Sequence, residues 1–579
     1  MAARYSDLLN VQLIIAYLKE NNIKNIVLSP GGRNVPLVHS VENDDFFNCY
    51  SIVDERSAAF FGLGLIQTLN EPVAICCTSG TAASNYMSAV AEAYYQKLPL
   101  VVLTADRNEY YLNQMEDQMI NQTKLFQTVC KKTVSLPIVK NTMDKWYCER
   151  LLNEAFLELN HHGTGPIQIN FQVEDIAAGF NTEVLPSIKP IKRIEQHSSE
   201  NEWDLIEERL KNTKKILIIY GQSSPITIQE QKNLKIFFDK YGSVFLVDHL
   251  SNLEMDETIN SYTIVQGNKN ETMNELLPDL VISVNGNYVS SVRTWLKKNS
   301  GKFDHWLVSN EGIVADPFRS LEKIFECSAK EFFKRLVEED HIVETADKTY
   351  FEMWRKAEDS INIPIFDYSV MSAIQKFMQM VPSNVNLHLA NSNTVRIAQL
   401  FKKKENITVF CNRGTNGIDG SASTFMGNAV VSEKLNFLLI GDLSFFYDMN
   451  SIWNRYINPN LRIMMFNDSG AGIFHASIGE KLVPSLNNFV SAEHNAVAKD
   501  WVESQGFQYL SVNNDEELNN AMEIFVRENN SKPLFMEVFT KKEIDKEMLA
   551  SFFRKSKINN LWNADKKTLA KAVFNKFKK

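Results

Sequence analysis

Residues 52–107 constrain the fold of this chain more than any other stretch. After a β-type run that reaches Glu55, two short apolar runs at 73–78 and 100–105 alternate with segments of helical spacing. This alternation predicts a βαβαβ unit with a parallel sheet, in which ligands bind beyond the carboxyl ends of the strands. Function is therefore expected at the polar residues around those ends, which are Glu55, residues 78–81, Asp106 and Arg107.

The same alternation recurs along the chain and predicts three α/β blocks. Further strands are expected at 25–28 and 166–170 in the first block, at 216–220, 244–247, 280–284 and 305–308 in the second, and at 386–389, 408–410, 437–440 and 462–466 in the third. The fold class is therefore α/β, with three doubly wound parallel-sheet domains, the first and third similar in layout. The predicted division is a first domain at 1–185, a central domain at 200–345, a third domain at 355–545 and a C-terminal helical tail at 546–579.

The composition argues against several classes of function. The 579 residues include 61 basic and 70 acidic side chains, and the net charge of −9 argues against binding to nucleic acid. The seven cysteines include no CxxC pair, so we expect neither a disulfide framework nor a zinc site, and a reducing compartment fits best. The N-terminus lacks a signal-peptide pattern and no apolar run has the length of a bilayer. A cytoplasmic protein without a membrane span is therefore expected.

Acidic residues follow two neighbouring runs of the third block. Gly441 and Asp442 close the run at 437–440, and Asn467 and Asp468 close the run at 462–466. Because the carboxyl ends of adjacent parallel strands meet at one edge of a sheet, their oxygens would lie close together, as a Mg²⁺ site requires. The two aspartates could instead cap turns, and their spacing alone does not decide between these interpretations.

Seven motifs along the chain resemble those of one enzyme family. In order they are SPGGR, DERSAAFFGLGLIQ, TSGTAASNY, EAYYQKLPLVVLTADR, NRGTNGIDG, GDLSFFYDMNS and GAGIF. They are similar to the motifs of 2-succinyl-5-enolpyruvyl-6-hydroxy-3-cyclohexene-1-carboxylate synthases, which are thiamine-diphosphate-dependent transferases of menaquinone biosynthesis. GDLSFF takes the place of the GDG that is usual among thiamine enzymes.

This resemblance implies an architecture and a reaction. The first domain would bind the pyrimidine ring of thiamine diphosphate, and the third would bind its diphosphate through Mg²⁺ or Mn²⁺. The reaction would decarboxylate 2-oxoglutarate and add the resulting succinyl semialdehyde carbanion to isochorismate, with release of carbon dioxide. In this arrangement each cofactor lies between two subunits, so a homodimer or a dimer of dimers is implied.

The resemblance also assigns roles to individual residues. The implied catalytic residues are Glu55, which would activate the cofactor, Gln118 and Arg33. The implied cofactor contacts are Glu55, Ile418, Ser392, Gly441, Asp442 and Leu443, with Ile418 as the apolar wedge that bends the cofactor. The implied metal ligands are Asp442, Asp468 and the backbone carbonyl of Gly470. The implied substrate contacts are Ser392, Arg396 and Arg413 for the oxoacid-derived intermediate, Arg33, Arg107, Gln118 and Arg293 for isochorismate, and also Ile473 and Phe474.

Two other interpretations stay open from the sequence. An acetolactate-synthase-like carboligase that uses pyruvate would need fewer arginines, because its substrates carry fewer carboxylates. A catalytically silent assembly subunit would not need Glu55, Asp442 and Arg413 together. The chain departs from the usual family residues at Gly32, Asp117, Val292 and Asp468, the last of which is often Asn. The resemblance gives no role to His475 or to the lysine-rich end of the tail.

Overall fold

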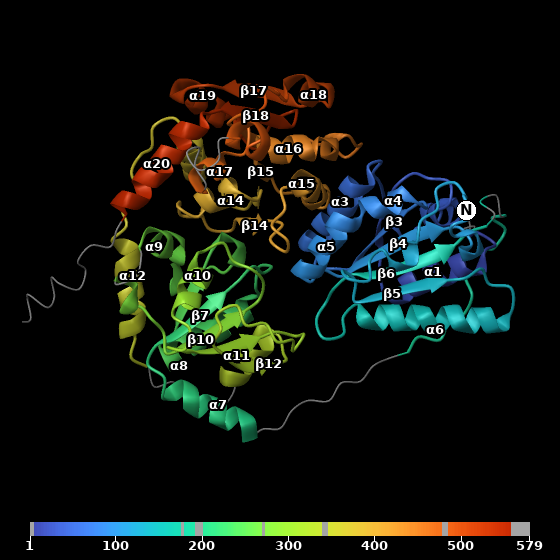
Figure 1. The fold of residues 1–579 in the computed structure, drawn as a ribbon, viewed down its shortest axis with the longest axis horizontal. Coiled ribbons are helices and arrows are strands. Elements are labelled where there is room, and N and C mark those ends of the chain that lie inside the picture. The colour runs from blue at the N-terminus through green and yellow to red at the C-terminus, as the bar shows by residue number, and fades with distance from the viewer. Residues whose placement is uncertain are drawn as a thin grey trace, which may run out of the picture.

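The computed structural model describes residues 5–174, 176, 179–191, 201–268, 272–337, 346–477 and 485–556, and of residues 201–202, 272, 475–477 and 487 it describes the backbone only. Over these residues the chain forms three α/β blocks, each built around one six-stranded sheet. Figure 1 shows the first block at the right, the middle block at the lower left and the third block at the top. All strand pairs within the three sheets are parallel, which confirms the predicted fold class.

The first sheet has the strand order β2-β1-β3-β4-β6-β5. Its strands are β1 (Asn25–Leu28), β2 (Asn48–Ser51), β3 (Val73–Cys77), β4 (Leu100–Asp106), β5 (Lys132–Leu136) and β6 (Ile167–Gln172). Its helices are α1 (Leu9–Glu20), α2 (Val35–Glu42), α3 (Glu55–Leu69), α4 (Thr81–Asn85), α5 (Met87–Gln96) and α6 (Thr142–Glu158). Of the predicted βαβαβ unit, β3 and β4 lie at the centre of this sheet, while its first strand corresponds to β2 at the edge and ends at Ser51.

The third sheet repeats that order as β14-β13-β15-β16-β18-β17. Its strands are β13 (Asn386–Leu389), β14 (Thr408–Phe410), β15 (Asn436–Gly441), β16 (Leu461–Asn467), β17 (Gln508–Val512) and β18 (Leu534–Phe539). Its helices are α13 (Val370–Met380), α14 (Asn393–Ala398), α15 (Ser421–Val430), α16 (Asp442–Tyr447), α17 (Gly472–Ser477), α18 (Lys499–Ser504), α19 (Asp515–Phe525) and α20 (Lys542–Lys555), with a π-helical turn at Leu486–Val490. The expected likeness of the first and third blocks thus extends to the full strand order.

The middle sheet has a different order, β12-β11-β10-β7-β8-β9. Its strands are β7 (Ile216–Tyr220), β8 (Val244–Val247), β9 (Thr258–Asn260), β10 (Leu280–Val284), β11 (Asp304–Val308) and β12 (Leu321–Phe325). Its helices are α7 (Asn201–Lys211), α8 (Ile228–Tyr241), α9 (Ser261–Gly267), α10 (Val292–Lys298), α11 (Ala329–Val337) and α12 (Thr349–Asp359). This is the doubly wound order in which the chain reverses direction across the sheet between β7 and β10.

Five strands of the structure were not predicted from the sequence: β5, β9, β12, β17 and β18. The prediction of only four strands in the middle block is therefore wrong. Except for β18, these are edge strands, and β12 and β17 are largely half-buried or exposed. A strand that is not buried on both faces lacks the continuous apolar run by which the others were recognised.

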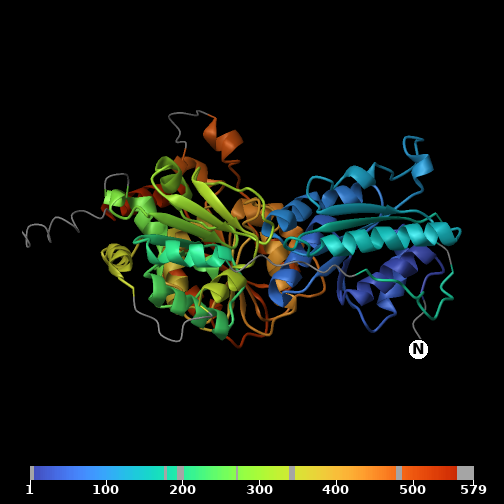
Figure 2. The same cartoon turned by 90° about the horizontal axis from the view of Figure 1, so that it is seen from below.

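The first and third blocks pack together through α3 and α15 (Figures 1 and 2). Asn428 of α15 donates from Nδ2 to the backbone carbonyl of Gly64 in α3 at 3.0 Å. The buried carboxylate of Glu92 accepts hydrogen bonds from the backbone N–H groups of Gly414 and Thr415 at 2.9 and 2.7 Å. These contacts fix the loop after β14 against the first block.

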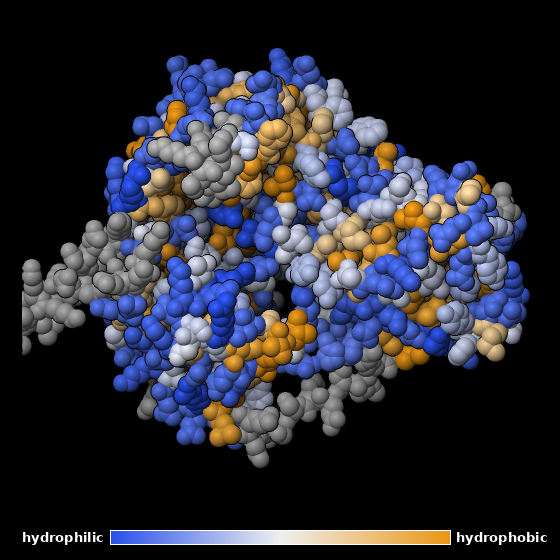
Figure 3. Space-filling model, viewed as in Figure 1, coloured by the Kyte–Doolittle hydropathy of each residue, from blue (hydrophilic) through white to orange (hydrophobic). Residues whose placement is uncertain are grey.

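No helix among the described residues is long and apolar enough to cross a membrane. Figure 3 shows that most of the surface on this side is hydrophilic, with hydrophobic residues in small groups. The predicted linker before residue 200 and the lysine-rich end beyond residue 556 lie partly or wholly outside the described residues.

Candidate active site

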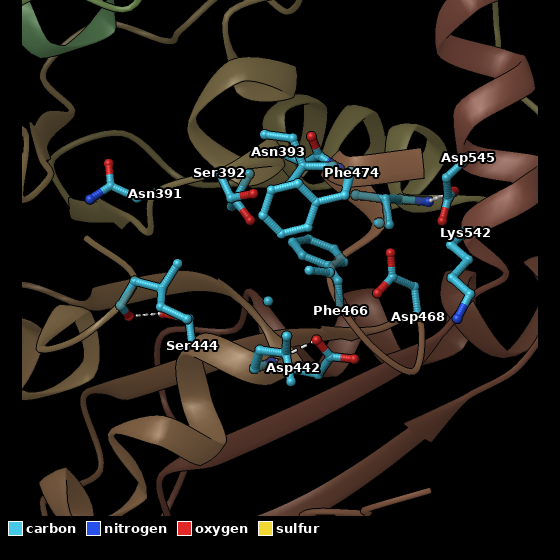
Figure 4. Close-up of a pocket in the computed structure, with 18 of the residues that line it drawn as sticks. Asn391, Ser392, Asn393, Asp442, Ser444, Phe466, Asp468, Phe474, Lys542 and Asp545 are labelled. Atoms are coloured by element: carbon cyan, nitrogen blue, oxygen red, sulfur yellow. Dashed lines mark hydrogen bonds between the residues drawn. The ribbon is translucent and has the colours of Figure 1, made fainter. Parts of the chain in front are cut away.

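A cavity of about 420 Å³ lies at the carboxyl edge of the third sheet. The segments that follow β13, β14, β15 and β16 form its walls, and α20 closes one side. Figure 4 shows Ser392 after β13, Asp442 after β15 and Asp468 after β16 around this space. The cavity is therefore at the sheet edge where a parallel α/β fold binds its ligands.

All third-block residues that the sequence marked as candidates line this cavity. They are Ser392, Arg396, Arg413, Ile418, Gly441, Asp442, Leu443, Asp468, Gly470, Ile473 and Phe474. The fold brings together motifs from separate parts of the chain, because four strand ends meet at one edge.

Asp442 and Asp468 lie close enough for their carboxylates to repel each other. Asp442 is buried in the first turn of α16, where its Oδ1 accepts a hydrogen bond from the N–H of Leu443 at 2.6 Å. Burial and the Asp442 carboxylate raise the pKa of Asp468 above its ordinary value. Because adjacent buried carboxylates destabilise each other without a cation, this pair offers the oxygen ligands that a hard divalent ion needs.

The backbone at Gly470 brings a third polar group to this pair. The φ angle of Gly470 is 141°, and a Cβ at this position would lie 2.6 Å from the carbonyl oxygen of Ser491. Glycine alone fits such a turn without strain. The N–H of Gly470 donates to Asp442 Oδ2 at 2.9 Å. The loop after β16 is thereby fixed to the end of β15.

The space beside Gly441 is suited to a cofactor with a diphosphate. A Cβ at Gly441 would meet no atom within 4 Å among the described residues, so the backbone here borders open space. Ile418 lines the same cavity with 40% of its surface exposed, although it is apolar, and Ser444 Oγ donates to its carbonyl at 2.5 Å. An exposed isoleucine, free space and two carboxylates fit thiamine diphosphate bound through a divalent cation.

Ser392 has a backbone conformation that residues other than glycine rarely adopt. Its φ and ψ angles are 76° and −132°, and it immediately precedes α14. Strain of this kind costs about 1–3 kcal/mol and is concentrated at ligand sites. Arg396 donates from Nη1 to the carbonyl of Ser392 at 2.6 Å, so the turn also orients an arginine of the cavity wall.

Two arginines give this cavity a cationic side. Burial and the charge of Arg413 lower the pKa of Arg396. Arg413 is itself buried, and its Nη1 donates to Asn391 Oδ1 at 3.0 Å. The Nε of Arg413 is buried without a hydrogen-bond partner among the described residues. A buried guanidinium with an unused donor is suited to bind a carboxylate.

Three other candidates lie at the carboxyl edge of the first sheet. Arg33 donates from Nη1 to two backbone carbonyls after β6, at 3.0 and 2.9 Å. Arg107 pairs with Glu116 at 3.1 Å, and burial together with the charge of Arg107 lowers the pKa of Arg33. Gln118 follows on an exposed loop with φ of 52°. Within one subunit these residues form a second cluster, which does not line the cavity of the third block.

Glu55 belongs to a helix and not to the end of a strand, which corrects the prediction. β2 ends at Ser51, and the side chain of Asp54 accepts from the N–H groups of Arg56 and Ser57 at 2.9 and 3.4 Å. This cap makes Glu55 the first residue of α3. The carboxyl group is half-buried, and burial, with the Asp54 charge adding to it, raises the pKa of Glu55. Glu55 also lies outside the wall of the third-block cavity.

Arg293 lies on α10 of the middle block. Its guanidinium lies 5.6 Å from the ring centre of Tyr288, and its Nη2 donates to Asn287 Oδ1 at 3.2 Å. Asn287 donates in turn from Nδ2 to the backbone carbonyl of Arg413 at 2.9 Å. Arg293 is therefore linked to the cavity through one side chain.

Helix α20 contributes residues that the sequence analysis did not identify. Lys542, Asp545, Lys546 and Leu549 line the cavity, and Figure 4 shows Lys542 and Asp545 beside Asp468. The intervals between them are three, one and three residues, as on one face of a helix. This spacing was the sequence pattern from which they could have been predicted.

His494 was also not identified from the sequence. Its Nε2 lies 3.2 Å from Asp442 Oδ2, and this neighbouring carboxylate raises the pKa of His494. The side chain of His475 lies outside the described residues.

Comparison with known proteins defines the class of the chain. A family model described as "Thiamine pyrophosphate enzyme, N-terminal TPP binding domain" matches residues 10–125. The crystal structure of benzoylformate decarboxylase from Polynucleobacter necessarius has a similar fold, with a TM-score of 0.69 at 14% identity over 92% of this chain and 99% of that one. The fold, the matched domain and the cavity identify a thiamine-pyrophosphate enzyme.

Curated relatives show the family within that class. The chain is 39% identical to 2-succinyl-5-enolpyruvyl-6-hydroxy-3-cyclohexene-1-carboxylate synthase of Bacteroides thetaiotaomicron, over 96% of this chain and 100% of that one. It is 32% identical to the synthase of Christiangramia forsetii, over 95% and 99% of the two chains. The chain belongs to the 2-succinyl-5-enolpyruvyl-6-hydroxy-3-cyclohexene-1-carboxylate synthase family.

Proposed function

We propose that this chain catalyses the decarboxylation of 2-oxoglutarate and the transfer of the succinyl semialdehyde unit to isochorismate, in menaquinone biosynthesis. The products are carbon dioxide and 2-succinyl-5-enolpyruvyl-6-hydroxy-3-cyclohexene-1-carboxylate. Membership of the synthase family supports this reaction. The structural observation that carries the donor assignment is the half-buried Arg396 beside the buried Arg413, on the wall of the cavity that also contains Asp442 and Asp468.

Bound thiamine diphosphate supplies the carbanion chemistry for decarboxylation and for carbon–carbon bond formation. In this proposal Asp442, Asp468 and the carbonyl of Gly470 hold Mg²⁺ or Mn²⁺, and Ser392, Gly441, Leu443 and Ile418 contact the cofactor. The carboxyl group of Glu55 holds a proton at the pyrimidine ring nitrogen. Its raised pKa supports this role, because a carboxyl group that shares a proton with a ring nitrogen must accept one near neutral pH.

In this proposal different arginines bind the carboxylates of the two substrates. Arg396 and Arg413, with Ser392, bind the oxoacid-derived unit, while Arg33, Arg107, Gln118 and Arg293 bind isochorismate. Ile473 and Phe474 form the apolar part of the substrate site and exclude water. Pyruvate would leave a buried guanidinium without a carboxylate, which disfavours the acetolactate-synthase-like alternative.

A complete site needs two subunits in this proposal. Glu55, Arg33 and Arg107 lie outside the third-block cavity of their own subunit, so the proposed active unit is a homodimer, alone or paired into a tetramer. The proposed domains are 1–185, 200–345, 355–545 and the tail at 546–579, and the first residues of this tail belong to α20, whose Lys546 and Leu549 line the cavity of the third block. A cytoplasmic location belongs to the same proposal and is supported by the seven free cysteines.

The direct test is a reaction containing protein, thiamine diphosphate, Mg²⁺, 2-oxoglutarate and isochorismate, with the product identified by mass. The expected result is the succinylated cyclohexene carboxylate, formed only when both substrates are present. Equal turnover of pyruvate in place of 2-oxoglutarate would favour the acetolactate-synthase-like reading. Failure to bind thiamine diphosphate in a titration would favour a catalytically silent subunit.

A further inference from the structure

The carboxyl edge of the middle sheet contacts the third block where doubly wound sheets usually bind a ligand. The strand order reverses between β7 and β10, and the crevice at such a reversal is the usual binding site. Here the loops after these two strands touch, since a Cβ at Gly221 would lie 1.9 Å from the carbonyl oxygen of Gly286. The crevice is therefore closed by the backbone of the middle block itself.

Three amide side chains at this edge bind the backbone of residues 409–413, which begin in β14. The hydrogen bonds run from Asn252 Nδ2 to the carbonyl of Val409 (2.9 Å), from Gln222 Nε2 to that of Cys411 (2.8 Å) and from Asn287 Nδ2 to that of Arg413 (2.9 Å). Asn252 Oδ1 also accepts from the N–H of Val409 at 2.8 Å. The contacted residues alternate along the segment, as they do when an edge strand pairs with a neighbour. The middle block thus pairs with β14 through side chains.

Asn287 differs from the other two amides because it also contacts a second arginine. Its Oδ1 accepts from Arg293 Nη2 at 3.2 Å while its Nδ2 donates to the carbonyl of Arg413. Asp248, which is buried, accepts from the N–H of Val289 at 2.6 Å and so fixes the loop that carries Asn287. One side chain therefore joins an arginine of the middle block to an arginine of the cavity wall.

We infer that Asn287 is a positioning residue that couples Arg293 to Arg413. A shift of either arginine would then change the position of the other, and with it the contacts to both substrates. The inference rests on the proposed function, which assigns Arg413 to 2-oxoglutarate and Arg293 to isochorismate. Asparagine suits this role because its amide has both a donor and an acceptor. An aspartate at this position keeps the oxygen that accepts from Arg293 and loses the N–H group that donates to the backbone carbonyl of Arg413.

The test compares Asn287→Ala, Asn287→Asp and the control Gln222→Ala in the full-length protein with thiamine diphosphate and Mg²⁺. Asn287→Ala is expected to raise the KM for both substrates about ten-fold, the effect of one lost hydrogen bond, and to leave kcat within about three-fold. Asn287→Asp should raise the KM for 2-oxoglutarate and leave that for isochorismate near wild type. Gln222→Ala removes an equivalent hydrogen bond to the same segment, and should lower the thermal midpoint similarly without changing either KM.

Equal KM values for Asn287→Ala and Gln222→Ala would overturn the inference. If Asn287 only held the segment in place, its loss would change the KM values no more than the loss of Gln222 does. So would an Asn287→Asp variant that changes the two KM values together. A double-mutant cycle of Asn287→Ala and Arg293→Ala, measured as thermal midpoints, tests the coupling without substrate. Non-additive shifts are expected and additive shifts contradict it. Absence of turnover in the wild-type protein would refute the proposed function, and this cycle would still decide the coupling.

Discussion

The first and third sheets have the same strand order, yet their carboxyl edges differ. The edge of the third sheet surrounds a cavity of about 420 Å³. At the edge of the first sheet, the fully buried Gln122 accepts from the N–H of Gly80 at 2.7 Å. The same side chain donates to the carbonyl of Ala105 at 3.1 Å and to Asn170 Oδ1 at 3.0 Å. A duplicated topology thus brings polar groups to both edges, but in the first sheet they bond to one another.

This difference explains why the candidate residues form two clusters within one subunit. The third edge supplies a cavity with the proposed metal ligands, while the first edge supplies Glu55, Arg33 and Arg107 outside that cavity. In the proposed function, each edge alone lacks part of the chemistry that the reaction needs. We therefore regard the two edges as complementary halves, and the following predictions test that comparison from the largest expected effect to the smallest.

Glu55→Gln should abolish most activity and leave the fold intact. Loss of a positioned acid–base group costs on the order of 10²- to 10⁴-fold in kcat. The measurement is proton exchange at the reactive thiazolium carbon, followed alongside turnover. Exchange as fast as in the wild type would remove Glu55 from the proposed role.

The pH dependence of the thermal midpoint of Glu55→Gln separately tests the raised pKa of Glu55. Burial makes the pKa of Glu55 higher in the folded protein than in the unfolded chain, so the folded state binds more protons between those two values. Stability contributed by this group is therefore lost as the pH rises through that interval. At pH 7 and above, Gln should match or exceed Glu in thermal midpoint, and the advantage should vanish at low pH. A lower midpoint for the variant at every pH would contradict this reading.

Asp442→Ala should weaken the binding of Mg²⁺ and, with it, of thiamine diphosphate. We expect a loss on the order of 10²-fold in Mg²⁺ affinity. Removing a residue that only hydrogen-bonds a metal ligand costs about 10- to 100-fold, and the loss of a ligand itself should reach the upper end of that range. Calorimetric titration of the protein with metal and cofactor measures it. Asp468→Asn is the matched control, because it keeps an oxygen ligand while relieving the repulsion with Asp442, and it should retain metal binding.

The arginines should separate into donor and acceptor groups. Arg396→Ala and Arg413→Ala should slow acceptor-free decarboxylation of 2-oxoglutarate, whereas Arg33→Ala and Arg107→Ala should mainly affect the reaction with isochorismate. Loss of one buried charged contact costs about 2–5 kcal/mol, or roughly thirty-fold or more in rate. Following carbon dioxide release with and without isochorismate tests the division. If Arg33→Ala and Arg413→Ala impaired the acceptor-free decarboxylation equally, the division into donor and acceptor arginines would be wrong.

Gln122→Ala should affect stability more than activity. It leaves the N–H of Gly80 and other buried groups at the first edge without a partner, at a cost of about 1–3 kcal/mol in free energy of unfolding. Chemical denaturation measures this loss, with the neighbouring Thr123→Ala as a control that should change stability by about 0.5 kcal/mol or less. An unfolding free energy equal to wild type for Gln122→Ala would show that the first edge is not held by this side chain.

The sequence predicted the buried strands well, because parallel strands covered on both faces are continuous apolar runs. β1, β7, β8, β10, β13 and β14 have the predicted bounds. The edge strands β12 and β17 escaped prediction, and β2 was predicted too far along the chain, because their exposure breaks those runs. Asp442 and Asp468 were found from their places at two strand ends, whereas Ser392, Arg396, Arg413 and the other wall residues of the third block were assigned from the resemblance to one enzyme family. Lys542 and His494 were missed because no motif includes them. Only the packing of α20 brings Lys542 to the cavity wall, and only the loop after the π-helical turn brings His494 beside Asp442.

The most direct test of the account is complementation between two inactive variants. If each site combines the first edge of one subunit with the third edge of another, a mixed dimer of Glu55→Gln and Asp442→Ala subunits has one intact site and one doubly altered site. After subunit exchange at equal concentrations, half of the dimers are mixed, so about a quarter of the wild-type activity should return. Recovery near that level supports the shared site. No recovery, with mixed dimers demonstrated by mass, would show that each subunit carries a complete site and would contradict the account.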